Sequence, residues 1–285
     1  MPRSKRTREL LLSTRSLPSG PSVELIGLSL NWARMEGLFW LSSLPLKTLE
    51  IFEWFGDVSN EYGPGKYLGK FLCEHPEIDD LNLKACRSRH DLRPQLSFSE
   101  SLYIKGSQFP AFKRLTLRDY DWLQPIGFAT TCWDWSRLIS LSLVRVAVIS
   151  FLRSVGPENL NSLKAFSTVG HGAHSLETRR ELERLLIRLF ETVKSFHSLH
   201  VPILHAEDML FSMAKHSDSL NTLTLFSLKQ SDLDVSIPPM ILDIYKLAAW
   251  FKNIYELHID LCLDWYRPTL KEWVAAIAAS ATCVG

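Results

Sequence analysis

Nine segments of this chain share one spacing of apolar residues, apolar-x-x-apolar-x-apolar. The clearest examples contain Leu-Thr-Leu at 115–117 and 223–225 and Leu-Ser-Leu at 141–143. Apolar and polar positions alternate in them, as in a strand with one buried side and one solvent-facing side. The central apolar residues are Leu28, Leu49, Leu81, Leu115, Leu141, Phe166, Leu199, Leu223 and Leu257. The pattern therefore predicts nine short strands at intervals of 21 to 34 residues.

Between these segments the apolar spacing becomes helical. In 178–195 one face carries Leu182, Leu185, Leu186, Leu189, Phe190 and Val193. Thr178 and Glu181 have the spacing of a capping box at its start. Further helices are predicted at 65–74, 147–154, 206–215, 239–251 and 269–280. Because strands and helices alternate, the chain is predicted to be an α/β protein with a parallel sheet and helical crossovers.

Two architectures fit this alternation, an open solenoid and a closed eight-stranded barrel. Barrel strands are buried on both faces and are almost continuously apolar. Here polar residues such as Glu50, Asn82 and His200 interrupt the apolar ones. This favours an open solenoid (a horseshoe) with parallel strands on its concave face and helices on its convex face. The alternative, a (β/α) barrel enzyme, requires reactive groups at the carboxyl ends of strands, and its candidates are Lys84, Arg118, Asp119, Asp260 and Asp264.

Composition narrows the domain organisation and the class of protein. Residues 1–20 are basic and are expected to form a disordered N-terminus. Residues 21–285 are expected to form one repeat domain, closed at its C-terminal end by the helix near 269–280. The net charge of +1 does not indicate a nucleic-acid partner, and no apolar run has the length of a membrane span. The five cysteines lack a CxxC pair, which favours a cytoplasmic or nuclear protein.

The sequence contains no convincing catalytic, metal or cofactor site. His171, His174 and Glu177 would need a helix to converge on a metal, but Gly172 indicates a loop. The segment Gly63–Lys66 lacks the flanking residues of a phosphate-binding loop and is better explained as the start of a helix. We therefore predict a non-enzymatic protein without a cofactor.

The repeated segments resemble the leucine-rich repeats of eukaryotic F-box proteins, fungal members most of all. The resemblance is carried by Phe-Lys-Arg-Leu-Thr-Leu (112–117), Ser-Arg-Leu-Ile-Ser-Leu-Ser-Leu (136–143) and Asp-Ser-Leu-Asn-Thr-Leu-Thr-Leu (218–225), and it covers 25–260. It implies an open solenoid that recognises substrates for a cullin–RING ubiquitin ligase. No F-box pattern precedes Leu25, so the ligase adaptor is expected as a partner only if an F-box is supplied upstream. A truncated gene model and a relative that has lost the box both remain open, as does a repeat scaffold with no ubiquitin role.

The predicted binding surface is the concave face of the sheet, where a protein partner is expected. Its basic middle contrasts with an acidic C-terminal end, and its two phenylalanines are candidate anchors for a partner pocket. The predicted contact residues are Glu50, Phe52, Asn82, Lys84, Arg114, Thr116, Arg118, Ser142, His200, Thr224, Phe226, Glu256, His258 and Asp260.

Overall fold

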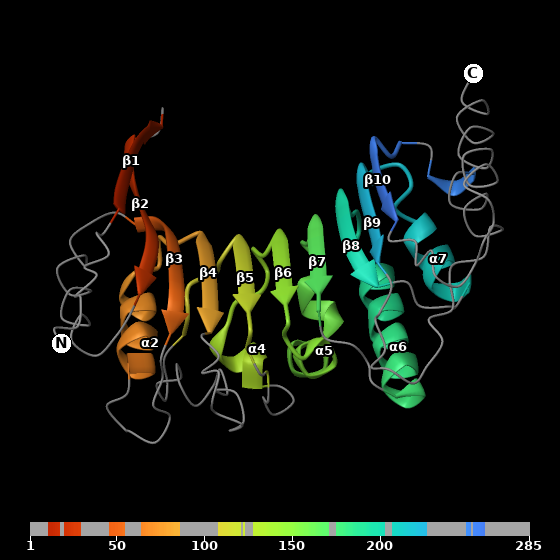
Figure 1. Ribbon diagram of the computed structural model, residues 1–285, viewed down its shortest axis with the longest axis horizontal. Helices are drawn as coiled ribbons and strands as arrows, with labels where there is room; N and C mark the ends of the chain where they lie inside the picture. Colours follow the sequence, from red (N-terminus) through yellow and green to blue (C-terminus); the bar gives the residue numbers. More distant parts are fainter. Residues whose placement is uncertain are drawn as a thin grey trace, which may run out of the picture.

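The computed structural model describes residues 11–17, 20–29, 46–54, 64–85, 108–120, 122, 128–170, 175–202, 207–226, 249–251 and 253–259. These residues contain a ten-stranded sheet in which the strands follow one another in chain order from β1 to β10. Figure 1 shows this single row of strands running from one end of the molecule to the other, with the helices joining successive strands. Because the two terminal strands are not neighbours in the sheet, the closed-barrel alternative is wrong.

The nine strands expected from the repeats are all present, and they pair in parallel with their neighbours. Their bounds are β2 (Gly20–Ser29), β3 (Leu46–Trp54), β4 (Asp80–Ala85), β5 (Arg114–Arg118), β6 (Ser140–Val144), β7 (Ala165–Val169), β8 (Ser198–Pro202), β9 (Thr222–Phe226) and β10 (Glu256–Ile259). This is the predicted open leucine-rich-repeat solenoid.

A tenth strand, β1 (Leu11–Leu17), pairs antiparallel with β2. For 11–17, the expectation of a disordered N-terminus over residues 1–20 is therefore wrong. The pairing explains the difference, because the edge of β2 offers backbone donors and acceptors that β1 satisfies.

Four of the described helices agree with predicted segments, whereas the short helices at 128–132 and 157–160 were not predicted. Their bounds are α2 (Pro64–Glu74), α4 (Phe128–Cys132), α5 (Val148–Val155), the 3₁₀ helix η2 (Pro157–Leu160), α6 (Leu176–Thr192) and α7 (Glu207–Ala214). The capping box of α6 uses Ser175 and Thr178 rather than Thr178 and Glu181, because the helix begins earlier than the apolar stripe indicates. Of the helix expected at 239–251, only residues 249–250 are described as helical, and 269–280 lies outside the described residues.

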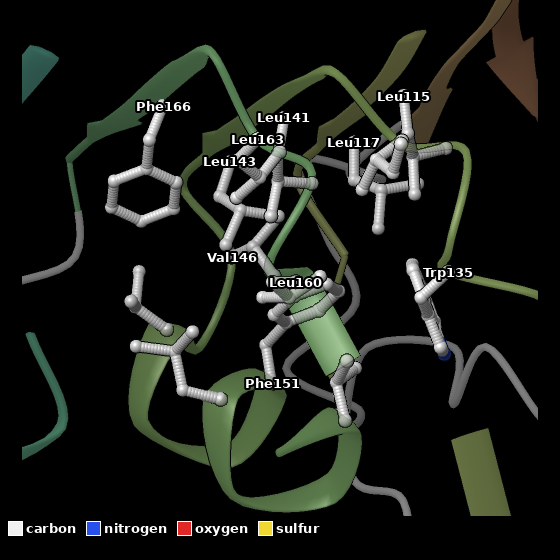
Figure 2. Close-up of a cluster of buried hydrophobic side chains, with 14 of the residues drawn as sticks. Leu115, Leu117, Trp135, Leu141, Leu143, Val146, Phe151, Leu160, Leu163 and Phe166 are labelled. Atoms are coloured by element: carbon white, nitrogen blue, oxygen red, sulfur yellow. The ribbon is translucent and has the colours of Figure 1, made fainter. Parts of the chain in front are cut away.

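The core lies between the sheet and the helices. The central apolar residue of each strand pairs with its counterpart on the next, beginning with Leu49, Leu81 and Leu115. From β3 to β9 these central side chains are at most 2% exposed. Figure 2 shows Leu115, Leu141 and Phe166 on the strands above Phe151 of α5. In β2 the register differs from the prediction, because Leu25 rather than Leu28 pairs with Leu49, with irregularities in the pairing.

Three consecutive strands end in left-handed backbone turns at equivalent positions. The φ angles there are 62° at Asp119, 51° at Arg145 and 85° at Gly170. The buried Asp119 carboxylate accepts two hydrogen bonds from the Arg145 guanidinium, one of them 2.7 Å from Nη2 to Oδ2. A side chain at Gly170 would be strained by its φ and would meet Cγ of Arg145 at 2.9 Å. An ion pair and a glycine thus fix the backbone at the carboxyl ends of β5, β6 and β7.

Replacing Leu115 by Ala should lower the free energy of unfolding by about 2–5 kcal/mol, because it leaves a cavity between β5 and the helices. Replacing the neighbouring Thr116 by Ala should lower the free energy of unfolding by less than about 1 kcal/mol, because Thr116 points away from the core. Denaturant unfolding of both variants measures the difference. Equal losses would contradict the assignment of the two faces.

Replacing Arg145 or Asp119 should lower the stability of the protein by different amounts. Arg145→Met leaves a buried carboxylate without its guanidinium and should cost about 2–3 kcal/mol. Asp119→Asn leaves a guanidinium whose side chain is already 46% exposed, and Asn tolerates the left-handed backbone, so about 1 kcal/mol is expected. Chemical denaturation should therefore rank Arg145→Met as the less stable variant, and the reverse order would contradict this account.

Candidate protein-binding face

The face of the sheet opposite the leucine core, called the open face below, is built by the side chains that alternate with the core residues. Its central row runs in register across β3 to β10, through Glu50, Asn82, Thr116, Ser142, Ser167, His200, Thr224 and His258. Those from β3 to β9 are partly exposed, in contrast to the buried leucines beside them. The sequence analysis chose all of this row except Ser167, which the same alternation could have identified.

The part of the open face on β3 to β5 is charged, and several of its charged side chains are bonded to neighbours within the sheet. Arg114 Nε lies 2.7 Å from Asp80 Oδ1, and this hydrogen bond raises the pKa of Arg114. Thr48 also donates to the Asp80 carboxylate, at 3.4 Å. Two residues further along β4, the side-chain amide of Asn82 donates a hydrogen bond to the carboxylate of Glu50. Arg114 is therefore already engaged within the sheet, although its side chain is 65% exposed.

Lys84 and Arg118 differ from Arg114. They lie side by side as register partners on β4 and β5. Arg118 is exposed and Lys84 is partly exposed, and neither has an ion-pair or hydrogen-bond partner recorded in the described part of the chain. The carboxylate nearest in sequence to Arg118, that of Asp119, is buried and bonded to Arg145. These two cations are thus the part of the predicted basic middle that is free to meet a partner.

The middle of the open face, on β6 and β7, carries short side chains. It consists of Ser140, Ser142, Ala165 and Ser167, with Val144 and Val169 at the strand ends. All six are partly exposed. A partner can therefore approach the backbone more closely here than beside the long side chains of β4 and β5.

The C-terminal part of the open face combines aromatic and imidazole groups. The rings of His200 and Phe226 meet edge to face, with centroids 5.2 Å apart. His258 Nε2 lies 2.8 Å from Glu256 Oε1. Burial lowers the pKa of His200, and the nearby His258 lowers it further when it carries a charge. His200 is therefore mostly neutral at neutral pH.

Two of the predicted contact residues cannot be placed on the open face. Phe52 belongs to β3, but its side chain lies outside the described residues, as does all of Asp260. Val169, which was not predicted to lie on this surface, shares the open face with Arg118 and Val144. It could have been found by extending the alternation one step past its motif.

Two observations on the described residues concern metal binding and cavities. They include no group of three His, Cys, Asp or Glu side chains placed to hold a metal ion. A cavity of about 370 Å³ lies beside Trp133 and Trp135, and its two carboxylates are Asp134 and Glu158. Asp134 accepts the backbone N–H of Ser136, and Glu158 pairs with a guanidinium of α6, so both already have partners.

Of the residues considered as candidates for a barrel enzyme, Lys84 and Arg118 are the two that the described part of the chain brings together as neighbours in the sheet. Lys84 and Arg118 lie on the open sheet, Asp119 is held by Arg145, and Asp264 is outside the described part of the chain, as are His171 and His174. Pro64 of the Gly63–Lys66 segment begins α2, as the sequence analysis expected. Among the helices that are described, none has the length and apolar character needed to cross a membrane.

Comparison with known proteins gives little further information. No family model matches the chain, and no curated protein matches it. Among solved structures, an internalin (inlF) from Listeria monocytogenes is 12% identical, with 84% of this chain and 81% of that chain covered and a TM-score of 0.28. The assignment to the leucine-rich-repeat class therefore rests on the strand register and the repeated core described above.

The electrostatic coupling of the two histidines gives a testable result. His258→Gln removes a charge that disfavours protonation of His200, so the pKa of His200 should rise toward its ordinary value while remaining below it because of burial. NMR titration of the imidazole resonances measures this shift. An unchanged His200 pKa would show that the two rings do not interact across β9.

Proposed function

We propose that this chain is a non-enzymatic protein-interaction module whose partner binds the open face. The observation that supports this most is the central row of partly exposed polar side chains, in register from strand to strand over a fully packed core. Such a row gives a rigid surface, because every side chain is positioned by a hydrogen-bonded strand. Rigid positioning reduces the entropy lost on binding, which favours recognition of another protein.

The finer proposal is substrate recognition for a cullin–RING ubiquitin ligase of the F-box type, in the cytoplasm or nucleus. Its support is the resemblance of the repeats to those of F-box proteins. An adaptor is a partner under this proposal only if an F-box lies upstream of the repeats. A repeat scaffold without a ubiquitin role is the second candidate.

Affinity purification from the native cells, followed by quantitative mass spectrometry, tests the proposal. The full chain is compared with a variant, Ser142→Arg/Thr224→Arg, that places two long charged side chains on the open face. A control variant, Glu177→Arg/Asp208→Arg, places two arginines at exposed positions of α6 and α7 and raises the net charge by more than the open-face variant does. Specific partners should fall at least about tenfold with the open-face variant and remain with the control.

The outcomes separate the candidates. Stoichiometric cullin and adaptor subunits would support the ligase receptor, whereas a specific partner without them would support the scaffold. Equal recovery of every partner by the wild type and the open-face variant would contradict binding at the open face. Circular dichroism melting of all three proteins checks that the arginines leave the fold intact.

A further inference from the structure

In the β4–β6 region of the sheet the described aspartates are paired with cations, whereas two of the described cations have no recorded anionic partner. Its aspartates are already paired: Asp79 with Lys113 at 2.8 Å, Asp80 with Arg114 at 2.7 Å, and Asp119 with Arg145. Lys84 and Arg118 remain, adjacent to each other in the sheet and without a recorded anionic partner in the described part of the chain. Two adjacent cations repel each other, and an anion between them would remove that repulsion.

The same row of the open face becomes apolar immediately beyond Arg118. Arg118 pairs in register with Val144, which pairs with Val169. Neighbouring strands lie about 4.8 Å apart, so Val144 is about 7 Å and Val169 about 12 Å from the midpoint between Lys84 and Arg118. These spacings match side chains i+2 and i+4 of an extended peptide, which lie about 7 and 13 Å from side chain i.

We infer that β4–β7 of the open face binds an acidic, extended segment of a partner protein with the pattern acidic-x-aliphatic-x-aliphatic. A carboxylate at position i lies between Lys84 and Arg118, and the aliphatic side chains at i+2 and i+4 cover Val144 and Val169. The segment crosses the strands above Ser142 and Ser167, whose short side chains leave room for its backbone. This inference rests on the proposed function and specifies the chemistry of the partner.

Charge complementarity favours a carboxylate-bearing peptide over a nucleic acid. A phosphate backbone is bound by many cations along its length. Here the two free cations are followed by two valines rather than by further basic residues. A nucleic acid would therefore gain contacts only at one end of the row, whereas an acidic-aliphatic segment gains them along all of it.

An array of short synthetic peptides, probed with the tagged full chain, tests the inference. Positions i, i+2 and i+4 are varied over all amino-acid types in a Gly/Ser background, and single-stranded oligonucleotides are spotted beside them. The strongest signals should come from Asp or Glu at i with Leu, Ile or Val at i+2 and i+4. Lys84→Glu/Arg118→Glu should weaken them about tenfold, because an attraction becomes a repulsion.

The charge-matched control is Arg180→Glu/Lys194→Glu, which reverses two exposed cations on and just after α6. It should leave the peptide signals unchanged. The inference is overturned if no peptide binds, if acidic residues at i bring no preference, if both double variants lose binding equally, or if the oligonucleotides outcompete the peptides.

The same variant separates this inference from the proposed function. If Lys84→Glu/Arg118→Glu still recovers the cellular partner that Ser142→Arg/Thr224→Arg loses, the open face binds a protein but the acidic pattern is wrong. If both variants recover the partner at the wild-type level, the proposed function itself fails. Loss of the partner with both variants, together with the acidic preference on the array, supports both.

Discussion

The structure depends on one constraint, the register of the parallel ladder that runs from β3 to β10. Because side chains alternate with a period of two, a slip of one residue in any strand would exchange its core face with its open face. From β3 to β9, each strand is held against such a slip by its two neighbours and by the burial of Leu49 and its counterparts at 0–2% exposure, whereas Leu257 of the terminal strand β10 is 43% exposed. The same constraint fixes the rows of the open face, so the proposed binding surface is a direct consequence of the packing beneath it.

The ladder is shortest between β7 and β8, where only three residue pairs are described, from Ala165 with Ser198 to Ser167 with His200. Two sequence features coincide with this point. Thr168 occupies a position that the other strands from β3 to β10 fill with leucine, isoleucine or valine, and it is 4% exposed. Pro202, at the end of β8, has no N–H to donate. The junction divides the open face into a charged and serine-rich part and a part that carries His200 and Phe226.

Local features of the sequence were enough to predict the strands and most helices. Alternation and helical spacing are properties of neighbouring residues, so the strand around Leu115 and the helix at 147–154 could be found without knowing what they pack against. The register of the first repeat was predicted wrongly, because the spacing of Leu25, Leu28 and Leu30 does not show which of these leucines lies opposite Leu49. Only pairing with β3, where Leu25 meets Leu49, selects between them.

The binding face could be predicted as a set of positions but not as a set of available charges. Arg114 and Arg118 look equivalent in the sequence, yet Asp80 on the neighbouring strand engages the first and leaves the second. This difference depends on a pairing 34 residues distant in the chain. The strand-end turns were missed for a related reason, since a left-handed backbone at Asp119 and Arg145 has no glycine to signal it.

The balance of charges has a consequence for how the open face selects a partner. With a net charge of +1, the molecule has little long-range field to steer an approaching protein. Lys84 and Arg118 act within a Debye length of about 8 Å, so they can orient a segment only after it has touched the sheet. Selectivity must then come from short-range contacts. The carboxylate would set the position of the segment, and burial against Val144 and Val169 would supply most of the favourable free energy.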